Sequence, residues 1–252
     1  MISDPFSKYV HCCDCEELVE SLEDRSVDLF LFDPPYHEIV EEKWDNSWNS
    51  LDEYAQWFRS LMLDKFYPKL KEDGSIIFFG GVGSHGHHPF WKVVISLESA
   101  QSCLMFRNTI TWQKRRAYGK SHDYLFCREE IAWFSASNKR TKVNFNIPLT
   151  NELRGYQGYN KKYPAKSPYK RVSNVWNDIP ELMRPRRTAE KPVKLMERLV
   201  LTHSNPGQLV VDPFAGLGPT GVAAIKSGRR FVGCDVDQSA CDIANHDCEA
   251  LK

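Results

Sequence analysis

The sequence carries no excess of charge of either sign, since 33 Lys and Arg residues balance 33 Asp and Glu residues. The chain as a whole therefore does not look like a nucleic-acid binder, and only local clusters of charge can serve that purpose. No apolar run approaches the roughly 18 residues of a membrane helix. Residues 1–5 also lack the basic and apolar regions of a signal peptide. We therefore expect a soluble protein in the cytoplasm.

The chain also lacks a convincing metal site or disulfide framework. Cys12 and Cys15 have the spacing of zinc ligands, but no second pair of ligands follows nearby. His85, His87 and His88 lie in a Gly-rich stretch, where exposed histidines are ordinary. Most of the eight cysteines fall inside apparent strands and helices, which suits buried, reduced thiols. We expect no metal.

Short apolar runs alternate with segments of helical character along most of the 252 residues. The predicted strands are Tyr9–Cys13, Val27–Phe32, Ser75–Phe79, Asn108–Trp112, Glu130–Phe134, Leu209–Val211 and Arg230–Gly233. The predicted helices are Cys15–Leu22, Leu51–Leu70, Pro192–Thr202, Pro219–Lys226 and Gln238–Leu251. This alternation predicts an α/β fold with a doubly wound, mostly parallel, seven-stranded Rossmann-like sheet.

The most informative motif is Asp33-Pro34-Pro35-Tyr36, directly after the apolar run Val27–Phe32. The run reads as a buried parallel strand, and the two prolines end its hydrogen-bonding ladder. A carboxylate, a free carbonyl and an aromatic ring then stand at the carboxyl end of the strand, where open α/β sheets bind ligands. This group suits a flat heterocycle that bears an amino group. A strand-ending turn with a satisfied Asp is the plain alternative.

A second motif runs from Val210 to Gly221 and reads as a strand, a Gly-rich turn and the start of a helix. Gly216 and Gly218 allow close approach of a ligand to the backbone, and the helix N-terminus favours an anionic group. Asp235 ends the next strand, at the spacing where nucleoside-binding folds place the acid that accepts from ribose hydroxyls. A Walker lysine is absent, which argues against nucleotide hydrolysis.

Positive charge is concentrated between residues 138 and 187, where 12 Lys and Arg residues face three acidic ones. Aromatic residues are interleaved with them, from Phe145 to Trp176. Such a segment in a neutral protein is typical of a phosphate-binding surface. A solvated, partly mobile insertion is the alternative.

Together these residues resemble the β group of DNA amino-methyltransferases, which act on adenine N6 or cytosine N4. The likeness runs from about Tyr9 to Ala250, with the Asp-Pro-Pro-Tyr motif first, then the basic segment, then the Gly-rich loop. It implies S-adenosylmethionine as cofactor. The implied catalytic residues are Asp33, Pro34, Pro35 and Tyr36. The implied cofactor-binding residues are Asp14, Lys191, Asp212, Phe214, Ala215, Gly216, Gly218 and Asp235.

Three departures from the family pattern concern the contacts around the cofactor. His37 stands where Asn usually follows the catalytic Tyr, and residues 187–190 replace the usual His-Pro-Thr-Gln. Leu217 and Pro219 stand where the cofactor loop usually has Ser and Thr. The glycines of the loop and both acids are present.

The resemblance implies site-specific methylation of adenine N6 in double-stranded DNA, by direct displacement on a flipped base. Cytosine N4 methylation stays open, although that activity more often has Ser in place of Asp33, and so does a catalytically inactive DNA-binding module. Residues 1–137 and 188–252 would form the catalytic domain, and 138–187 the target-recognition insertion. The candidate DNA contacts are Lys114, Arg115, Arg154, Lys161, Lys162, Lys170, Arg171 and Arg184. A homodimer, a cognate restriction endonuclease and a prokaryotic or phage origin are further expectations from the resemblance.

Overall fold

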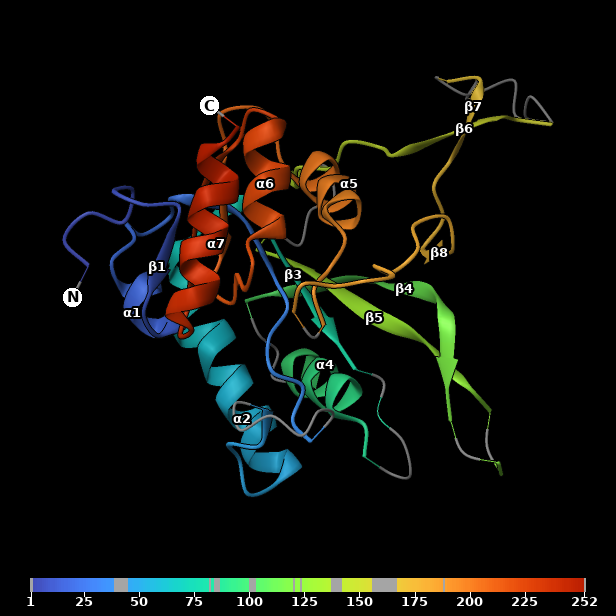
Figure 1. Ribbon diagram of the computed structural model, residues 1–252, viewed down its shortest axis with the longest axis horizontal. Coiled ribbons are helices and arrows are strands. Elements are labelled where there is room, and N and C mark those ends of the chain that lie inside the picture. The colour runs from blue at the N-terminus through green and yellow to red at the C-terminus, as the bar shows by residue number, and fades with distance from the viewer. Residues whose placement is uncertain are drawn as a thin grey trace.

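A computed structural model gives the architecture (Figure 1). It describes residues 2–38, 45–81, 83, 87–99, 103–119, 121–122, 124–136, 142–155, 167–187 and 189–251. The strands are β1 Val10–Cys12, β2 Val27–Phe32, β3 Leu70–Gly80, β4 Met105–Tyr118, β5 Phe126–Ser135, β6 Leu149–Leu153, β7 Tyr169–Arg171, β8 Val175–Trp176, β9 Leu209–Asp212 and β10 Arg230–Asp235. The α-helices are α1 Cys15–Glu20, α2 Leu51–Ser60, α3 Tyr67–Lys69, α4 Pro89–Ser99, α5 Val193–His203, α6 Pro219–Lys226 and α7 Gln238–Glu249, and a π-helical stretch, Leu61–Phe66, joins α2 to α3.

The main sheet has the order β1-β10-β9-β2-β3-β5-β4-β8 among the described strands. Of these, β5 alone runs against the others. The predicted doubly wound, mostly parallel fold is therefore confirmed, but the expected number of seven strands is wrong. The eighth strand is β8, a short edge strand that comes from the basic segment and pairs with β4.

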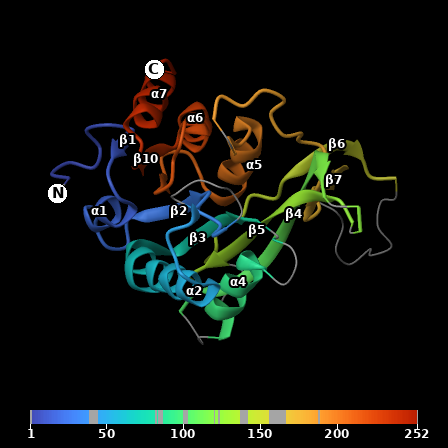
Figure 2. The same cartoon turned by 60° about the horizontal axis from the view of Figure 1, so that its bottom comes forward.

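The sheet is covered on both faces, as Figure 2 shows with α5, α6 and α7 on one side and α1, α2 and α4 on the other. The sequence of β2 explains this sandwich, because all six of its residues are buried. Phe30 and Phe32 pack into the cluster under α1, α2 and α4. Leu29 and Leu31 point the opposite way, into the cluster under α5, α6 and α7.

The carboxyl ends of β2 and β9 lie side by side at the centre of the sheet. From β2 the chain continues to β3 on one side, and from β9 it continues to β10 on the other. Phe30 pairs with Val211 across these two strands, and β3 follows on the other side of β2. In doubly wound sheets such a switch point leaves a crevice in which ligands bind. The strand ends at Asp33 and Asp212 are therefore placed at the expected site.

The first and last elements of the fold are joined to each other. β1 pairs in parallel with β10, and the Asn245 side chain of α7 accepts from the backbone amides of Tyr9 (3.1 Å) and Val10 (2.9 Å). The same side chain donates to the Val10 carbonyl at 2.8 Å. The half of the sheet that carries Asp14 and Asp235 is thus built from both ends of the chain.

The described parts of the basic segment are more ordered than the sequence suggested. β6 and β7 form an antiparallel hairpin that projects from the molecule, and β8 joins the main sheet. Trp176 and Ile179 are buried in the core, and the indole of Trp112 donates to the Ile179 carbonyl at 2.7 Å. The role of residues 138–187 as a separate recognition unit stays a proposal.

All eight cysteines carry free thiols. In the part of the chain that the structure describes, no cluster of His, Cys, Asp and Glu could hold a metal ion. No described helix is both long enough and apolar enough to cross a bilayer.

Candidate active site

The Asp-Pro-Pro-Tyr turn after β2 is held by side chains from the next segment of the chain. Asp45 is fully buried, and its Oδ1 accepts from the backbone amides of Tyr36 and, at 2.9 Å, His37. The Tyr54 hydroxyl of α2 donates to the Pro35 carbonyl at 2.7 Å. His37 has φ of 61°, a strained backbone region for a residue with a side chain. These contacts fix the turn and the direction of the Asp33 side chain.

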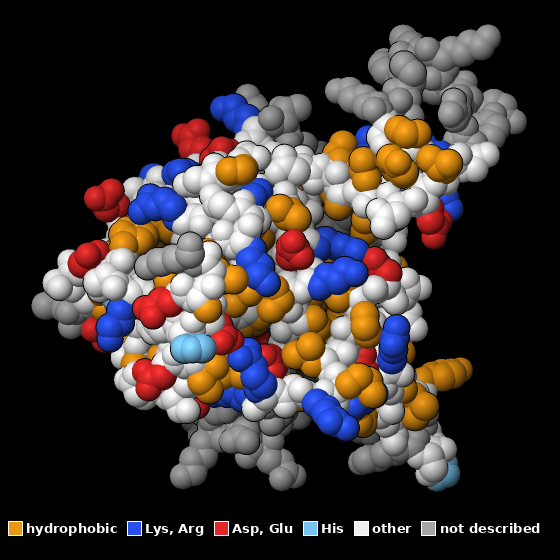
Figure 3. Space-filling view, turned by 45° about the horizontal axis from the view of Figure 1, so that its top comes forward, with side chains coloured by type: hydrophobic (Ala, Val, Ile, Leu, Met, Phe, Trp, Pro, Cys, Tyr) orange, Lys and Arg blue, Asp and Glu red, His pale blue; other side chains and the backbone are white. Residues whose placement is uncertain are grey.

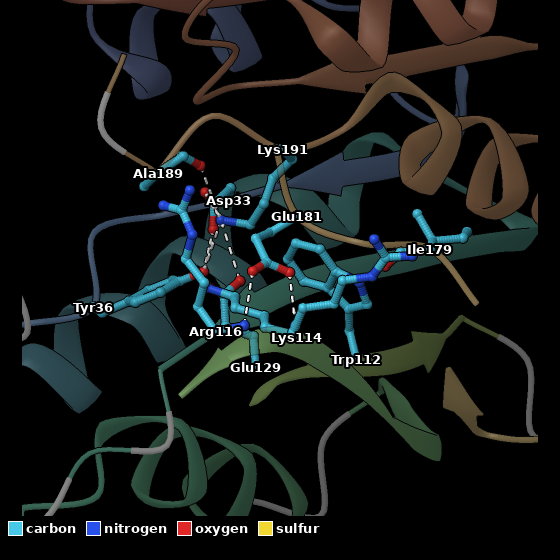
Figure 4. A network of polar contacts seen from close by, with 11 residues as sticks. Asp33, Tyr36, Trp112, Lys114, Arg116, Glu129, Ile179, Glu181, Ala189 and Lys191 are labelled. Carbon is cyan, nitrogen blue, oxygen red and sulfur yellow. Dashed lines mark hydrogen bonds and ion pairs between the residues drawn. The ribbon is translucent and has the colours of Figure 1, made fainter. Parts of the chain in front are cut away.

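Asp33 is the centre of a buried polar network, drawn in Figure 4. The Tyr36 hydroxyl donates to its Oδ1, and the Lys191 ammonium donates to its Oδ2. Lys191 comes from the turn before α5, and its ammonium also lies 3.3 Å from Glu129 Oε2 on β5. Glu129 Oε1 in turn accepts from Lys114 of β4. Charges of opposite sign therefore alternate from Lys114 to Asp33.

The network sets the protonation of its members. Burial raises the pKa of Asp33 despite the attraction of Lys191, and the negative charge of Glu129 adds to the rise. Burial works to lower the pKa of Lys191, but the carboxylates of Asp33 and Glu129 outweigh it and raise that pKa. Burial likewise opposes ionisation of Glu129, but Lys191 and Lys114 together lower its pKa. Lys191 is therefore an ammonium ion held between two carboxyl groups.

The Gly-rich loop follows β9 and takes the conformation that its glycines permit. Gly216 and Gly218 have φ of 52° and 75°. A Cβ at Gly218 would lie 2.8 Å from the Cβ of Ala244, so this position needs glycine for space as well as for conformation. Asp212 Oδ1 accepts from Phe214 N at 3.0 Å, and burial raises the pKa of Asp212 to about 7.

Asp235 stands opposite this loop at the end of β10. Its Oδ2 accepts from Gly216 N at 2.9 Å and its Oδ1 from Asp237 N at 3.0 Å. The guanidinium of Arg187 lies 3.6 Å from Asp235 and 3.7 Å from Asp237. Backbone amides thus orient the Asp235 carboxylate, and Arg187, from the segment before α5, lies beside it.

A cavity of about 480 Å³ lies between the two motifs. The predicted residues that line it are Asp14, Asp33, Pro35, Lys191, Asp212, Phe214, Ala215, Gly216 and Asp235. Pro34, Tyr36 and Gly218 are adjacent to lining residues in the chain but do not line the cavity. Trp48 and Trp57 complete the apolar part of the wall. The two motifs, far apart in the sequence, therefore form one site.

The predicted DNA contacts are not brought together into one cluster. Lys114 pairs with Glu129, while Arg115 is exposed beside it on β4. On the β6–β7 hairpin, Lys170 pairs with Glu152 at 2.8 Å. The other predicted contacts in the described part of the chain are Arg154, Arg171 and Arg184, and Arg154 Nε donates to the Tyr169 carbonyl at 2.8 Å. Lys161 and Lys162 lie outside the described residues.

Figure 3 shows hydrophobic side chains grouped on the projecting hairpin, apart from the Lys and Arg side chains on the body of the molecule. Leu149, Leu153 and Tyr169 are exposed there. The hairpin therefore presents an apolar patch as well as positive charge.

A comparison with known protein families shows to which family the chain belongs. The family described as DNA methylase, of the N6/N4 methyltransferase type, matches residues 27–246. The chain belongs to this family of DNA methylases. The match includes both motifs and the basic segment between them, in the order that the sequence predicted.

Individual relatives resemble the methylase over most of its length. The Type II methyltransferase M1.MboII of Moraxella bovis is 28% identical, with 94% of each chain covered. Among solved structures, the cytosine-N4-specific PvuII DNA methyltransferase has a TM-score of 0.70 at 18% identity, covering 96% of this chain and 90% of its own. The M1.HpyAVI–SAM complex has a TM-score of 0.59 at 18% identity, covering 94% and 98%. The structural likeness shows a common fold.

Four residues of the methylase site were not singled out as site residues from the sequence: Asp45, Tyr54, Glu129 and Arg187. Asp45 and Tyr54 lie in the stretch after the Asp-Pro-Pro-Tyr motif, and no pattern marked their contacts to the turn. Glu129 is one of two adjacent acids at the edge of a predicted strand, and only the sheet order shows which one faces Asp33. Arg187 was counted among the basic residues of the insertion, but it lines the cavity.

Proposed function

We propose that the protein transfers a methyl group from S-adenosylmethionine to N6 of adenine in double-stranded DNA, at a specific site. The supporting observation is the half-buried Asp33 carboxylate at the end of β2. It lines the same cavity as Asp212 and Asp235. Cytosine N4 is the second candidate, because its amino group offers the same two N–H bonds to the same carboxylate.

The residues around the cavity fit the proposed cofactor. Asp235 uses one oxygen for each backbone amide, and a carboxylate has about four acceptor sites, so it can also accept from ribose hydroxyls. The cavity wall around Asp235 is completed by Asp14, Asp212 and residues 214–216. Trp48 and Trp57 offer apolar surface. S-adenosylmethionine supplies a methyl group on a cationic sulfur, and an acidic pocket favours that positive charge.

The residues of the turn would orient the target base. The lone pair of an exocyclic amino group is delocalised into the ring, which makes the nitrogen a weak nucleophile. Asp33 and the Pro34 carbonyl accept its two N–H bonds and favour a pyramidal nitrogen, while the Tyr36 ring stacks on the base. The nitrogen loses one proton as it gains the methyl group, and Asp33 is the nearest base, with a pKa that burial raises.

Reaching an amino group inside a duplex requires flipping of the base, at a cost of a few kcal/mol that stacking and phosphate contacts offset. Arg115 and the exposed cations of residues 138–186 are the proposed phosphate contacts, whereas Lys114, which was also expected to contact DNA, is engaged with Glu129. The Type II relatives make a cognate restriction endonuclease a reasonable proposed partner. A homodimer and an intracellular, cytoplasmic location are proposed with it.

The Asp33→Ala variant tests this function. It should lose methyl transfer by at least about a hundredfold and still bind DNA, because the proposed role of Asp33 is confined to the reacting nitrogen. Transfer of labelled methyl groups, followed by mass spectrometry of the nucleosides, gives the rate and separates N6-methyladenine from N4-methylcytosine. Asp24→Ala, which removes an exposed acid paired with Lys69, is the control. Substantial turnover in Asp33→Ala would contradict the assignment.

A further inference from the structure

The Lys191 ammonium bonds to the carboxylate that the proposed reaction needs for the target amino group. It donates to Asp33 Oδ2, and Tyr36 holds Oδ1. Lys191 is 4% exposed, although it lines the cavity, so its ammonium depends on the neighbouring carboxylates for its hydrogen bonds. The target amino group must form a hydrogen bond with the same carboxylate. A carboxylate oxygen has a second acceptor site, but an ammonium on Oδ2 would leave a positive charge beside the nitrogen that has to attack a cationic sulfur. We therefore expect Lys191 to move away from Oδ2 when the base binds.

Glu129 offers the ammonium a second position. Its Oε2 is buried and accepts no hydrogen bond from any residue that the structure describes, although Lys191 Nζ is 3.3 Å away. Its other oxygen, Oε1, is already held by Lys114. A buried acceptor without a well-aligned hydrogen bond, such as Oε2, costs free energy. A better-aligned bond from Lys191 would recover that free energy.

The surroundings allow this movement without loss of charge balance. The rings of Phe79 and Tyr36 lie with their centroids 5.2 Å and 5.6 Å from Lys191 Nζ, within the range of cation–π attraction. A buried ammonium is stable only when it is paired. When the ammonium moves from Asp33 to Glu129 it stays paired with a carboxylate throughout. Only the Lys191 side chain has to change its conformation.

We propose that Lys191 is a positioning residue with two partners, bound to Asp33 in the DNA-free protein and transferred to Glu129 when the target amino group arrives. The inference rests on the proposed function and adds a role for Glu129 and Lys191 on the side of the target base. It replaces the expectation that Lys191 serves the cofactor. In the free protein the ammonium keeps Asp33 in place; in the complex Glu129 holds the ammonium away from the reacting nitrogen.

The Glu129→Gln variant removes the charge that attracts Lys191, so the ammonium should stay on Asp33. We expect the single-turnover rate of methyl transfer to fall at least tenfold, while the Kd for S-adenosylmethionine changes less than twofold by calorimetry. Glu130→Gln is the matched control, since Glu130 is the next buried acid of β5 and bonds with Thr111 and Arg128 instead. It should retain the wild-type rate.

Adding Lys191→Met to Glu129→Gln gives the result that separates this role from a structural one. Without the ammonium, Asp33 Oδ2 is open to the amino group and Tyr36 still holds Oδ1, so the double variant should be faster than Glu129→Gln alone at high pH. Its rate should rise with pH over a higher range than that of the wild type, because Asp33 has lost its counter-ion. Glu129→Asp, which keeps the charge, provides a second variant with an expected intermediate rate.

Each outcome decides a separate point. A wild-type rate in Glu129→Gln, or a double variant no faster than Glu129→Gln, would overturn the inference and leave the proposed function standing. Weaker S-adenosylmethionine binding in Lys191→Met, with unchanged binding in Glu129→Gln, would return Lys191 to the cofactor site. A wild-type protein that transfers no methyl group to DNA would overturn the proposed function and this inference together.

Discussion

Asp212 shows how the position of one residue contributes to the pH dependence of stability. Burial raises its pKa to about 7, and the charges of Asp33 and Asp235 contribute to the rise. An Asp in an unfolded chain has a pKa of about 3.9. The folded protein therefore holds this proton more tightly than the unfolded chain. Its stabilising effect is complete below about pH 4 and is lost as the pH rises through about 7.

The Asp212→Asn variant cannot lose that proton. Relative to the wild type, its free energy of unfolding should therefore be higher at about pH 8 than at about pH 5. Urea unfolding followed by circular dichroism at the two pH values measures the difference. Asp178→Asn is the comparison, because Arg198 lowers the pKa of Asp178 and its contribution is lost only in acid. If the free energies of unfolding of the wild type and Asp212→Asn differed by the same amount at both pH values, Asp212 would not titrate in this range.

At the scale of residues, the sequence predicted the acids that end strands and missed those that act through tertiary contacts. Asp33, Asp212 and Asp235 each follow an apolar run, so their strand-end positions can be read locally. The alternation of Lys114, Glu129, Lys191 and Asp33 joins three strands and a turn. It depends on the sheet order β2-β3-β5-β4, which no local pattern contains.

At the scale of elements, the buried strands were predictable and the exposed ones were not. β2, β9 and β10 are short apolar runs and appear close to the expected bounds. β6 and β7 are mostly exposed, so no alternation of apolar and polar residues marks them. Helix α4 was missed because it begins at Pro89, directly after a Gly- and His-rich stretch that reads as a loop.

The β6–β7 hairpin gives a prediction about DNA affinity. Arg171 on β7 makes no ion pair with any residue that the structure describes, whereas its neighbour Lys170 is paired with Glu152. Arg171→Gln should weaken binding to all sequences alike and reduce the salt dependence by about one unit of slope. Fluorescence anisotropy over a range of salt concentrations measures both. Lys65→Gln, at a cation paired with Glu16 and Glu20, should leave the slope unchanged.

At the scale of the whole molecule, the joint between β1 and α7 ties the first strand of the chain to its last helix. Asn245→Ala leaves the backbone amides of Tyr9 and Val10 without their acceptor, so the protein should lose about 1–3 kcal/mol of stability. Thermal and urea unfolding measure the loss. Asn245→Asp keeps the acceptor and loses the donor to the Val10 carbonyl, so its loss should be smaller. Equal losses in the two variants would contradict this division of roles.

The same joint has a consequence for how the protein is synthesised. The ribosome releases β2 and Asp33 early, while β9, β10 and α7 emerge last. Until then β1 has no neighbour, because its partner among the described strands is β10. A nascent chain that stops before Asp212 contains Asp33 but lacks the Gly-rich loop and Asp235, which line the other side of the cavity. The cavity between the two motifs therefore forms only when the chain has been made through β10.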